Sequence, residues 1–290
     1  MSTANTKQPV SLLRSALTTI WAHPAILFPF CCIAFVQFLI LEIIFFAPRY
    51  PLSAIFKPVI EKFEGPMFLH YPFNFIVFFK WAQSPWVQVP LFILIASFFV
   101  GMAVKTIDNI NRGNRAGMGD IFRQTLGVYV HLAIAAVLMM AVMFFFSKLH
   151  VLVLQRAAGM GSTEGFYFLA QKGIILSAPY VNFLLSILVT ALFAFMIPLI
   201  VIDKQNIFSA VRKNFQILSS SFWSMLLVIL LPGLLYLPVM LLKANRQLLE
   251  AMPVPEMWVG VIVFGVVVGL FVDALQYTAI TTYFLLRKEK

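Results

Sequence analysis

A carboxylate stands within a long apolar segment near the end of the chain. Asp273 follows Gly265 and Gly269 at intervals of four residues, and Gln276 lies three residues further on. Residues at these intervals share one face of a helix, so the small and polar residues form a single stripe. A carboxylate on this stripe could contact an ion or a substrate. Alternatively, the glycines admit a second helix and Asp273 forms a hydrogen bond with it, or an ion pair with Lys105.

The cost of exposing this carboxylate to lipid favours the packing interpretation of the stripe. A lipid-facing aspartate near the centre of a membrane helix costs ~2.5–3.5 kcal/mol. We therefore expect the stripe to pack against another helix, in this chain or in a partner chain. A leucine at Gly269 should then disrupt the structure more than a leucine at Val268.

Two other apolar segments contain candidates for a functional site. Glu42 stands five residues before Ala47, so it either contacts a solute or only reaches the membrane interface. Pro198 interrupts one apolar segment, and Pro232 and Pro238 interrupt the next. Broken helices expose backbone groups that bind ions or substrates in transporters. Kinks also occur in membrane helices without any such function.

Known catalytic and metal-binding patterns are absent from the sequence. The four histidines are scattered, and the two cysteines are adjacent, where their side chains diverge on a helix. No phosphate-binding loop, zinc-protease motif or serine–histidine–aspartate cluster is present. We expect no catalytic residue, no metal and no cofactor, and we expect that the protein is not an enzyme.

Composition places the chain in a membrane. Hydrophobic residues make up 61% of the sequence and charged residues only 11%, with a mean hydropathy of +0.94. Soluble domains contain about 25% charged residues. The net charge of +10 is spread over short segments between apolar runs, so membrane lipids rather than nucleic acid are the expected partner.

Six apolar stretches are long enough to cross a bilayer, which requires ~20 residues in a helix. The sequence therefore predicts an all-α, polytopic transmembrane bundle, with short amphipathic helices at the interfaces. We predict spans at residues 24–47, 87–104, 126–146, 179–202, 222–242 and 257–280.

The basic residues predict the orientation of the bundle. With six spans, both termini share one side, and that side carries twelve of the 21 lysines and arginines. The other nine are spread over longer loops. Because the loops of a membrane protein that are rich in lysine and arginine stay in the cytoplasm, we expect both termini to be cytoplasmic.

Short amphipathic segments precede the first, third and fifth spans, at residues 10–21, from 119 onward and at 207–215. Asp120 and Asn206 are the expected N-caps of the second and third of these helices. The pattern divides one integral membrane domain, 1–290, into possible repeats at 1–112, 113–203 and 204–290. Residues 51–63, 71–86 and 166–176 are expected to lie on the opposite membrane surface.

One stretch resembles a known family. In residues 196–223, Pro198 is followed by Asp203, by a helix with Ala210 and basic residues, and by Trp223 at the start of the fifth span. This order resembles the YciC-like proteins and the membrane domain of some glycerophosphodiester phosphodiesterases, which are bacterial six-span proteins. The long first outer loop departs from that group. The resemblance implies the bacterial inner membrane and a non-catalytic role, and it carries over no site residue.

Two functions fit these features. The first is a non-enzymatic membrane component that assembles with other membrane protein subunits, as a scaffold or as part of a transport or envelope-maintenance complex. The alternative is an autonomous transporter or channel for a small solute or a lipid, which Asp273 and the interrupted spans favour.

Overall fold

The computed structural model describes residues 8–71, 73–114, 116–159, 166–244 and 257–288. Over these residues the regular structure is helical, and six segments are long and apolar enough to cross a membrane, which confirms the predicted all-α bundle. The six segments are Pro24–Phe46, Pro85–Asn111, Tyr129–Ala158, Gln171–Val201, Phe222–Lys243 and Val259–Lys288.

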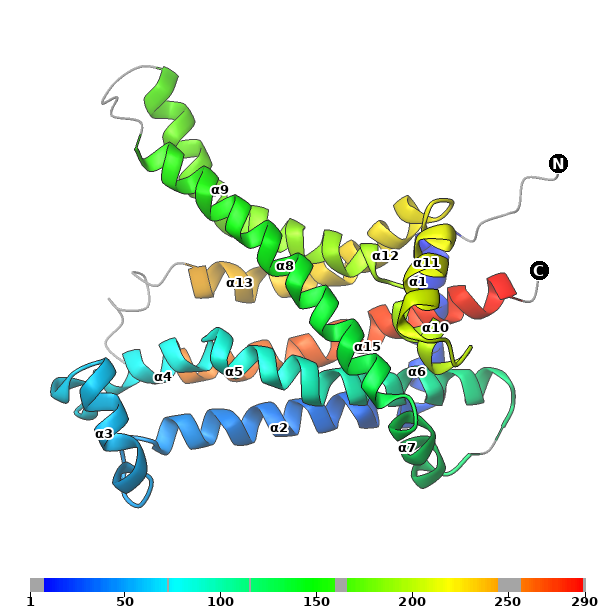
Figure 1. Cartoon of the computed structure of the whole chain (residues 1–290), viewed down its shortest axis with the longest axis horizontal. Coiled ribbons are helices and arrows are strands. Elements are labelled where there is room, and N and C mark those ends of the chain that lie inside the picture. Colours follow the sequence, from blue (N-terminus) through cyan, green and yellow to red (C-terminus); the bar gives the residue numbers. More distant parts are fainter. Residues whose placement is uncertain (1–7, 72, 115, 160–165, 245–256, 289–290) are drawn as a thin grey trace.

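Three of the spans run side by side (Figure 1). They contain α2 (Leu27–Phe46), α6 (Ser97–Asn111) and α15 (Met257–Lys288), which contact one another. The fifth span, which contains α12 (Phe222–Gly233) and α13 (Leu237–Ala244), packs on α15. The start of α1 (Pro9–Ala22) and the C-terminal end of α15 lie at one end of the bundle, here called the terminal side. The opposite end, where α3 (Ser53–Phe63) lies, is the distal side.

The remaining two spans form a hairpin that is inclined to the others (Figure 1). Helices α8 (Tyr129–Ala158) and α9 (Phe166–Leu192) contact each other along their length, and α9 also packs on α12. His150 of α8 lies 2.9 Å from the Asn182 side chain of α9, measured from Nδ1 to Oδ1.

The start of the fourth span corrects one prediction. Residues 166–176 do not form a separate surface helix, because α9 continues without interruption through Pro179. Ile174, Ile175 and Leu176 extend the apolar sequence, and α8 reaches Ala158, well beyond the predicted end of its span at residue 146. Each helix of the hairpin therefore gives the other a packing surface beyond the predicted limits of the spans.

The main hydrophobic core fills the terminal side. Fully buried side chains there come from α1 (Pro9–Ala22), from α10 (Met196–Val201) and from the spans around them. Phe30 stacks on Tyr277 with ring centroids 6.3 Å apart, and Phe195 stacks on Tyr283 at 6.0 Å. The terminal half of the bundle is therefore closely packed.

Helices precede the first, third and fifth spans, as the sequence predicts. They are α1, α7 (Met118–Leu126) and α11 (Ile207–Leu218). Asn206 caps α11, since its Oδ1 accepts from the Ser209 amide at 2.9 Å. The predicted cap at Asp120 is wrong, because α7 begins at Met118 and Asp120 lies in its first turn. The internal repetition itself stays a prediction.

The connection between the first two spans covers part of the distal side. It contains α3, the short helix η2 (Pro66–Leu69) and α4 (Asn74–Ala82), so the expected helix at residues 51–63 is present. Glu64 ties these elements together, accepting from Lys80 Nζ at 2.7 Å and from the Trp81 indole at 3.4 Å.

Candidate functional site

A partly open cavity of about 710 Å³ lies between five of the six spans. Its walls come from α2, from the second span around Gln88 and Leu91, from α9, from the fifth span and from α15. It begins on the terminal side at Phe30, Ile229 and Gln276, and it extends distally to Gln83 and Lys243. The cavity thus occupies the distal half of the bundle, whereas the core fills the terminal half.

The stripe on α15 predicted from the sequence faces this cavity. Gly265, Gly269, Asp273 and Gln276 all line it. On α15, Val267 and Phe271 are exposed hydrophobic residues that do not line the cavity. One face of α15 therefore meets the cavity and another is available to lipid.

The two glycines of the stripe differ in their surroundings. A Cβ atom at Gly265 would lie 2.9 Å from Val239 Cγ1 and 3.2 Å from Lys243 Nζ, so α13 packs closely there as predicted. At Gly269 a Cβ atom would meet no atom within 4 Å among the described residues. The predicted close helix contact is therefore wrong at Gly269 within this chain, where the missing side chain enlarges the cavity instead.

Asp273 is exposed to the cavity, near the middle of α15. It lies sixteen residues after Met257, about 24 Å along the helix at ~1.5 Å per residue. Within the described part of the chain, its carboxylate has no hydrogen bond or ion pair. The interhelical bond that the packing interpretation assigned to Asp273 is thus absent from these residues.

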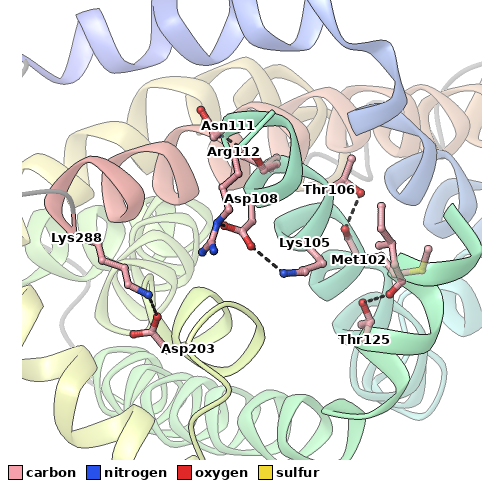
Figure 2. Close-up of polar contacts among 11 residues, drawn as sticks. Met102, Lys105, Thr106, Asp108, Asn111, Arg112, Thr125, Asp203 and Lys288 are labelled. Atoms are coloured by element: carbon pink, nitrogen blue, oxygen red, sulfur yellow. Dashed lines mark hydrogen bonds and ion pairs between the residues drawn. The ribbon is translucent and has the colours of Figure 1, made fainter. Parts of the chain in front are cut away.

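The suggested pairing of Asp273 with Lys105 is also wrong. Lys105 Nζ lies 2.8 Å from the Asp108 carboxylate, which Arg112 Nε contacts at 2.6 Å. Figure 2 shows both basic side chains directed at Asp108 on α6. The Asp108 side chain is fully buried, so two cations compensate a carboxylate that would otherwise be costly to bury.

Another ion pair ties the C-terminal end of α15 to the turn that follows the fourth span. Lys288 Nζ lies 2.6 Å from Asp203 Oδ1 (Figure 2), and Arg287 donates to the Ile217 carbonyl at 2.9 Å. Neither Asp108 nor Asp203 lines the cavity. These ion pairs belong to the packed terminal side, and Asp273 is the carboxylate of the cavity.

Polar side chains of α9 and α15 line the cavity near the depth of Asp273. The Gln276 side-chain amide donates to the Ile229 carbonyl in the fifth span. One turn further along that span, a Cβ atom at Gly233 would lie 3.5 Å from Ile187 Cδ1 of α9. This places the neighbours of Ile187 on α9 near the depth of Asp273. Ser186 and Thr190, which line the cavity, are such neighbours. Gln37 of α2 also lines it.

The sequence interpretation overlooked Ser186 and Thr190. They stand four residues apart, as Gly269 and Asp273 do, so the same spacing rule could have found them. Hydroxyl residues are common in membrane helices, however, and only the cavity that α9 and α15 both line gives these two a shared role.

Lys243 stands toward the distal end of the cavity. Its Nζ donates to the Tyr236 hydroxyl at 3.0 Å, and both residues line the wall. Because Lys243 packs on Gly265, eight residues before Asp273, the two charges are separated by about 12 Å along α15. The cavity thus has a carboxylate at its inner part and an ammonium group nearer its outer end.

The fifth span is interrupted at the cavity, as its prolines predict. Pro232 is near the end of α12, and the short helix η4 (Leu234–Tyr236) separates α12 from α13. Gly233 and Tyr236, at this break, line the cavity. The break therefore shapes the cavity wall beside α15.

The fourth span is interrupted away from the cavity. Residues 193–195 form a turn between α9 and α10, and Pro198 is buried in the first turns of α10 without lining the cavity. Asn214 of α11, fully buried, accepts from the Phe195 amide at 3.0 Å and donates to the Leu192 carbonyl at 2.7 Å. Asn214 thus occupies two of the backbone groups that the break frees, and Pro198 itself lies away from the cavity.

Glu42 lies outside the cavity. It is exposed near the distal end of α2 and does not line the cavity wall. This position agrees with the interpretation in which Glu42 reaches the membrane interface.

Six apolar helices arranged in this way define a multi-pass α-helical membrane protein. No family model matches the chain, and neither a curated protein nor a solved structure matches it.

Proposed function

We propose that the protein is a transporter that takes a small solute or a lipid into the cavity, without catalysing a reaction. The observation that carries this proposal is the carboxylate of Asp273, which has no hydrogen bond or ion pair among the described residues and lines a cavity of about 710 Å³ between membrane helices. Ligand pockets typically measure about 300–1,000 Å³. A charged residue in a membrane helix is costly and commonly marks the path of a substrate or ion.

The closed terminal side favours a transporter over a channel. On the terminal side of Gln276, the hydrophobic core fills the bundle, and this core includes the stacked rings of Phe30 and Tyr277. A channel requires a continuous path, whereas a transporter opens its binding site to one side at a time. Among the described residues, the cavity lining runs from Phe30 and Gln276 to Gln83 and Lys243 on the distal side, which fits a binding site that opens to one side.

The expected location follows from the basic residues and from the family resemblance. We propose a bacterial inner membrane protein with the terminal side in the cytoplasm, so that the cavity faces outward. The excess of lysine and arginine on the terminal side supports this orientation. Membership of the YciC-like group stays a proposal that rests on residues 196–223.

The assembly function predicted from the sequence remains the second proposal. A scaffold or complex subunit needs a partner surface, and the exposed aromatic side chains of Trp21, Phe208 and Trp223 could provide one or could lie among lipid headgroups. Isolation from native membranes, with mass spectrometry of the proteins retained, tests this proposal.

Filling the cavity tests the transporter proposal. Gly269→Phe adds a ring where no atom lies within 4 Å of the new Cβ, so the ring occupies cavity volume without a clash at its base. Val267→Phe is the matched control, because Val267 is exposed and does not line the cavity. Native mass spectrometry of protein released from micelles should detect a bound small molecule on the wild type and on Val267→Phe, and not on Gly269→Phe. Equal retention by both variants would contradict the proposal.

A further inference from the structure

The hydroxyl groups that line the cavity near the depth of Asp273 present acceptors rather than donors. Ser186 Oγ donates to the Phe183 carbonyl at 2.7 Å, and Thr190 Oγ1 donates to the Ser186 carbonyl at 2.9 Å. A hydroxyl group has one hydrogen and two lone pairs. Since each hydrogen is already used within α9, each oxygen can offer only its lone pairs to a ligand.

The Gln276 amide uses one of its two N–H groups within the bundle. Its Nε2 donates to the Ile229 carbonyl at 2.8 Å. Its carbonyl oxygen has no hydrogen bond among the described residues, so an acceptor is left free. Asp273, when ionised, also has acceptors and no donor. Four side chains at this depth therefore offer acceptors: Ser186, Thr190, Asp273 and Gln276.

We infer that this end of the cavity binds the ammonium group of an amine whose apolar part fills the rest of the cavity. A primary ammonium group carries a positive charge and three N–H donors, which complement one carboxylate and several neutral acceptors. An anionic group would be repelled by the carboxylate of Asp273 and could accept nothing from the hydroxyl groups of Ser186 and Thr190, whose hydrogens are used within α9. This inference rests on the proposed function and specifies its substrate class.

The remaining cavity wall explains why the ligand is larger than a bare cation. Between Asp273 and the distal end, apolar residues such as Leu41, Phe183 and Met240 line the cavity. A sodium ion could use the acceptors but would leave this apolar volume without a role. An apolar group attached to the amine removes that surface from water, which is favourable at roughly 25 cal/mol per Å².

Three probes with one ring system separate charge from apolar contact. They are naphthylmethylamine, which is a cation at neutral pH, naphthylmethanol, which is neutral, and naphthoate, which is an anion. Equilibrium dialysis with the purified full-length protein in lipid nanodiscs should show the order amine, alcohol, acid. Asp273→Asn should weaken binding of the amine by about tenfold to hundredfold, because the asparagine carbonyl can accept a hydrogen bond but carries no negative charge to pair with the ammonium group. Binding of the alcohol by this variant should stay within about threefold of the wild type.

Glu42→Gln is the matched control for removing a carboxylate. Glu42 lies in a membrane helix but does not line the cavity, so the amine should bind this variant as it binds the wild type. Retained binding of the alcohol by Asp273→Asn shows that the variant is folded with its cavity intact. If Asp273→Asn instead binds neither the amine nor the alcohol, its melting temperature shows whether the variant is unfolded or whether Asp273 contacts both probes directly. The double variant Ser186→Ala with Thr190→Ala then tests the hydroxyl acceptors alone. Unchanged binding of the amine by that double variant would overturn the inference.

Two other results would overturn the inference while leaving the cavity proposal standing. In the first, the amine and the alcohol bind equally and Asp273→Asn changes neither. In the second, sodium at physiological concentration displaces the amine completely, which assigns the acceptors to a metal ion. If none of the three probes binds the wild type and Gly269→Phe retains as much endogenous ligand as Val267→Phe, the proposed function itself fails.

Discussion

Asn214 satisfies two backbone groups that the break in the fourth span leaves without helical partners. Its amide bridges the Phe195 N–H and the Leu192 carbonyl from a separate helix, α11. A buried polar group without a partner costs about 1–3 kcal/mol. The position of the break therefore depends on a side chain nineteen residues further along the chain.

Replacement of Asn214 by alanine should lower the free energy of unfolding by about 1–3 kcal/mol, because it leaves the Phe195 N–H and Leu192 C=O unpaired. Unfolding in detergent, followed by circular dichroism, measures this change. Lys213→Ala is the control, since Lys213 is exposed on the same helix. Equal stability of the two variants would show that Asn214 does not hold the break.

The sequence predicted the residues of the stripe on α15 better than it predicted their roles. The four-residue interval placed Gly265, Gly269 and Asp273 on one face because helix periodicity is a local property. Whether that face meets a helix or a cavity depends on the paths of α9 and α13. This is why the predicted close contact is present at Gly265 and absent at Gly269 among the described residues, where a contact with a partner chain stays a prediction.

At the scale of the elements, the contact between α13 and α15 fixes the distal part of the cavity. Gly265→Leu should displace α13 and destabilise the protein by about 1–3 kcal/mol, because the new Cβ would lie 2.9 Å from Val239 Cγ1. The control is Gly260→Leu, since a Cβ at Gly260 would meet nothing within 4 Å among the described residues. Thermal unfolding in detergent compares them, and identical melting temperatures would contradict a close contact at Gly265.

The boundaries of the elements were predictable where strong local signals occur. Asn206 caps α11, and the prolines of the fifth span mark its interruption, because capping and proline geometry act over a few residues. The continuation of α9 from residue 166 was not predictable in this way. It depends on the extension of α8 alongside it, and that is a tertiary contact.

At the scale of the whole molecule, the six spans followed from composition, because each span needs only a sufficient length of apolar residues. The cavity did not follow, since it arises from the inclination of the α8–α9 hairpin and from the break in the fifth span.

The proposed orientation can be tested with cysteines introduced at Gln8 and Asn114 on the terminal side, and at Glu61 and Lys172 on the distal side. In intact cells, a membrane-impermeant thiol reagent should label only positions 61 and 172. Labelling of 172 together with 114 would contradict the topology.

The central claim is that a water-accessible cavity reaches the depth of Asp273 from the distal side. Accessibility of a cysteine at Gly269 tests this most directly, in a background with Cys31 and Cys32 replaced by alanine. Thiol reagents react in water and not in lipid, so a small charged reagent added on the distal side should modify Gly269→Cys, and Val267→Cys on the same helix should stay unmodified. If Gly269→Cys is as unreactive as Val267→Cys, the helices close over this face and the account is contradicted.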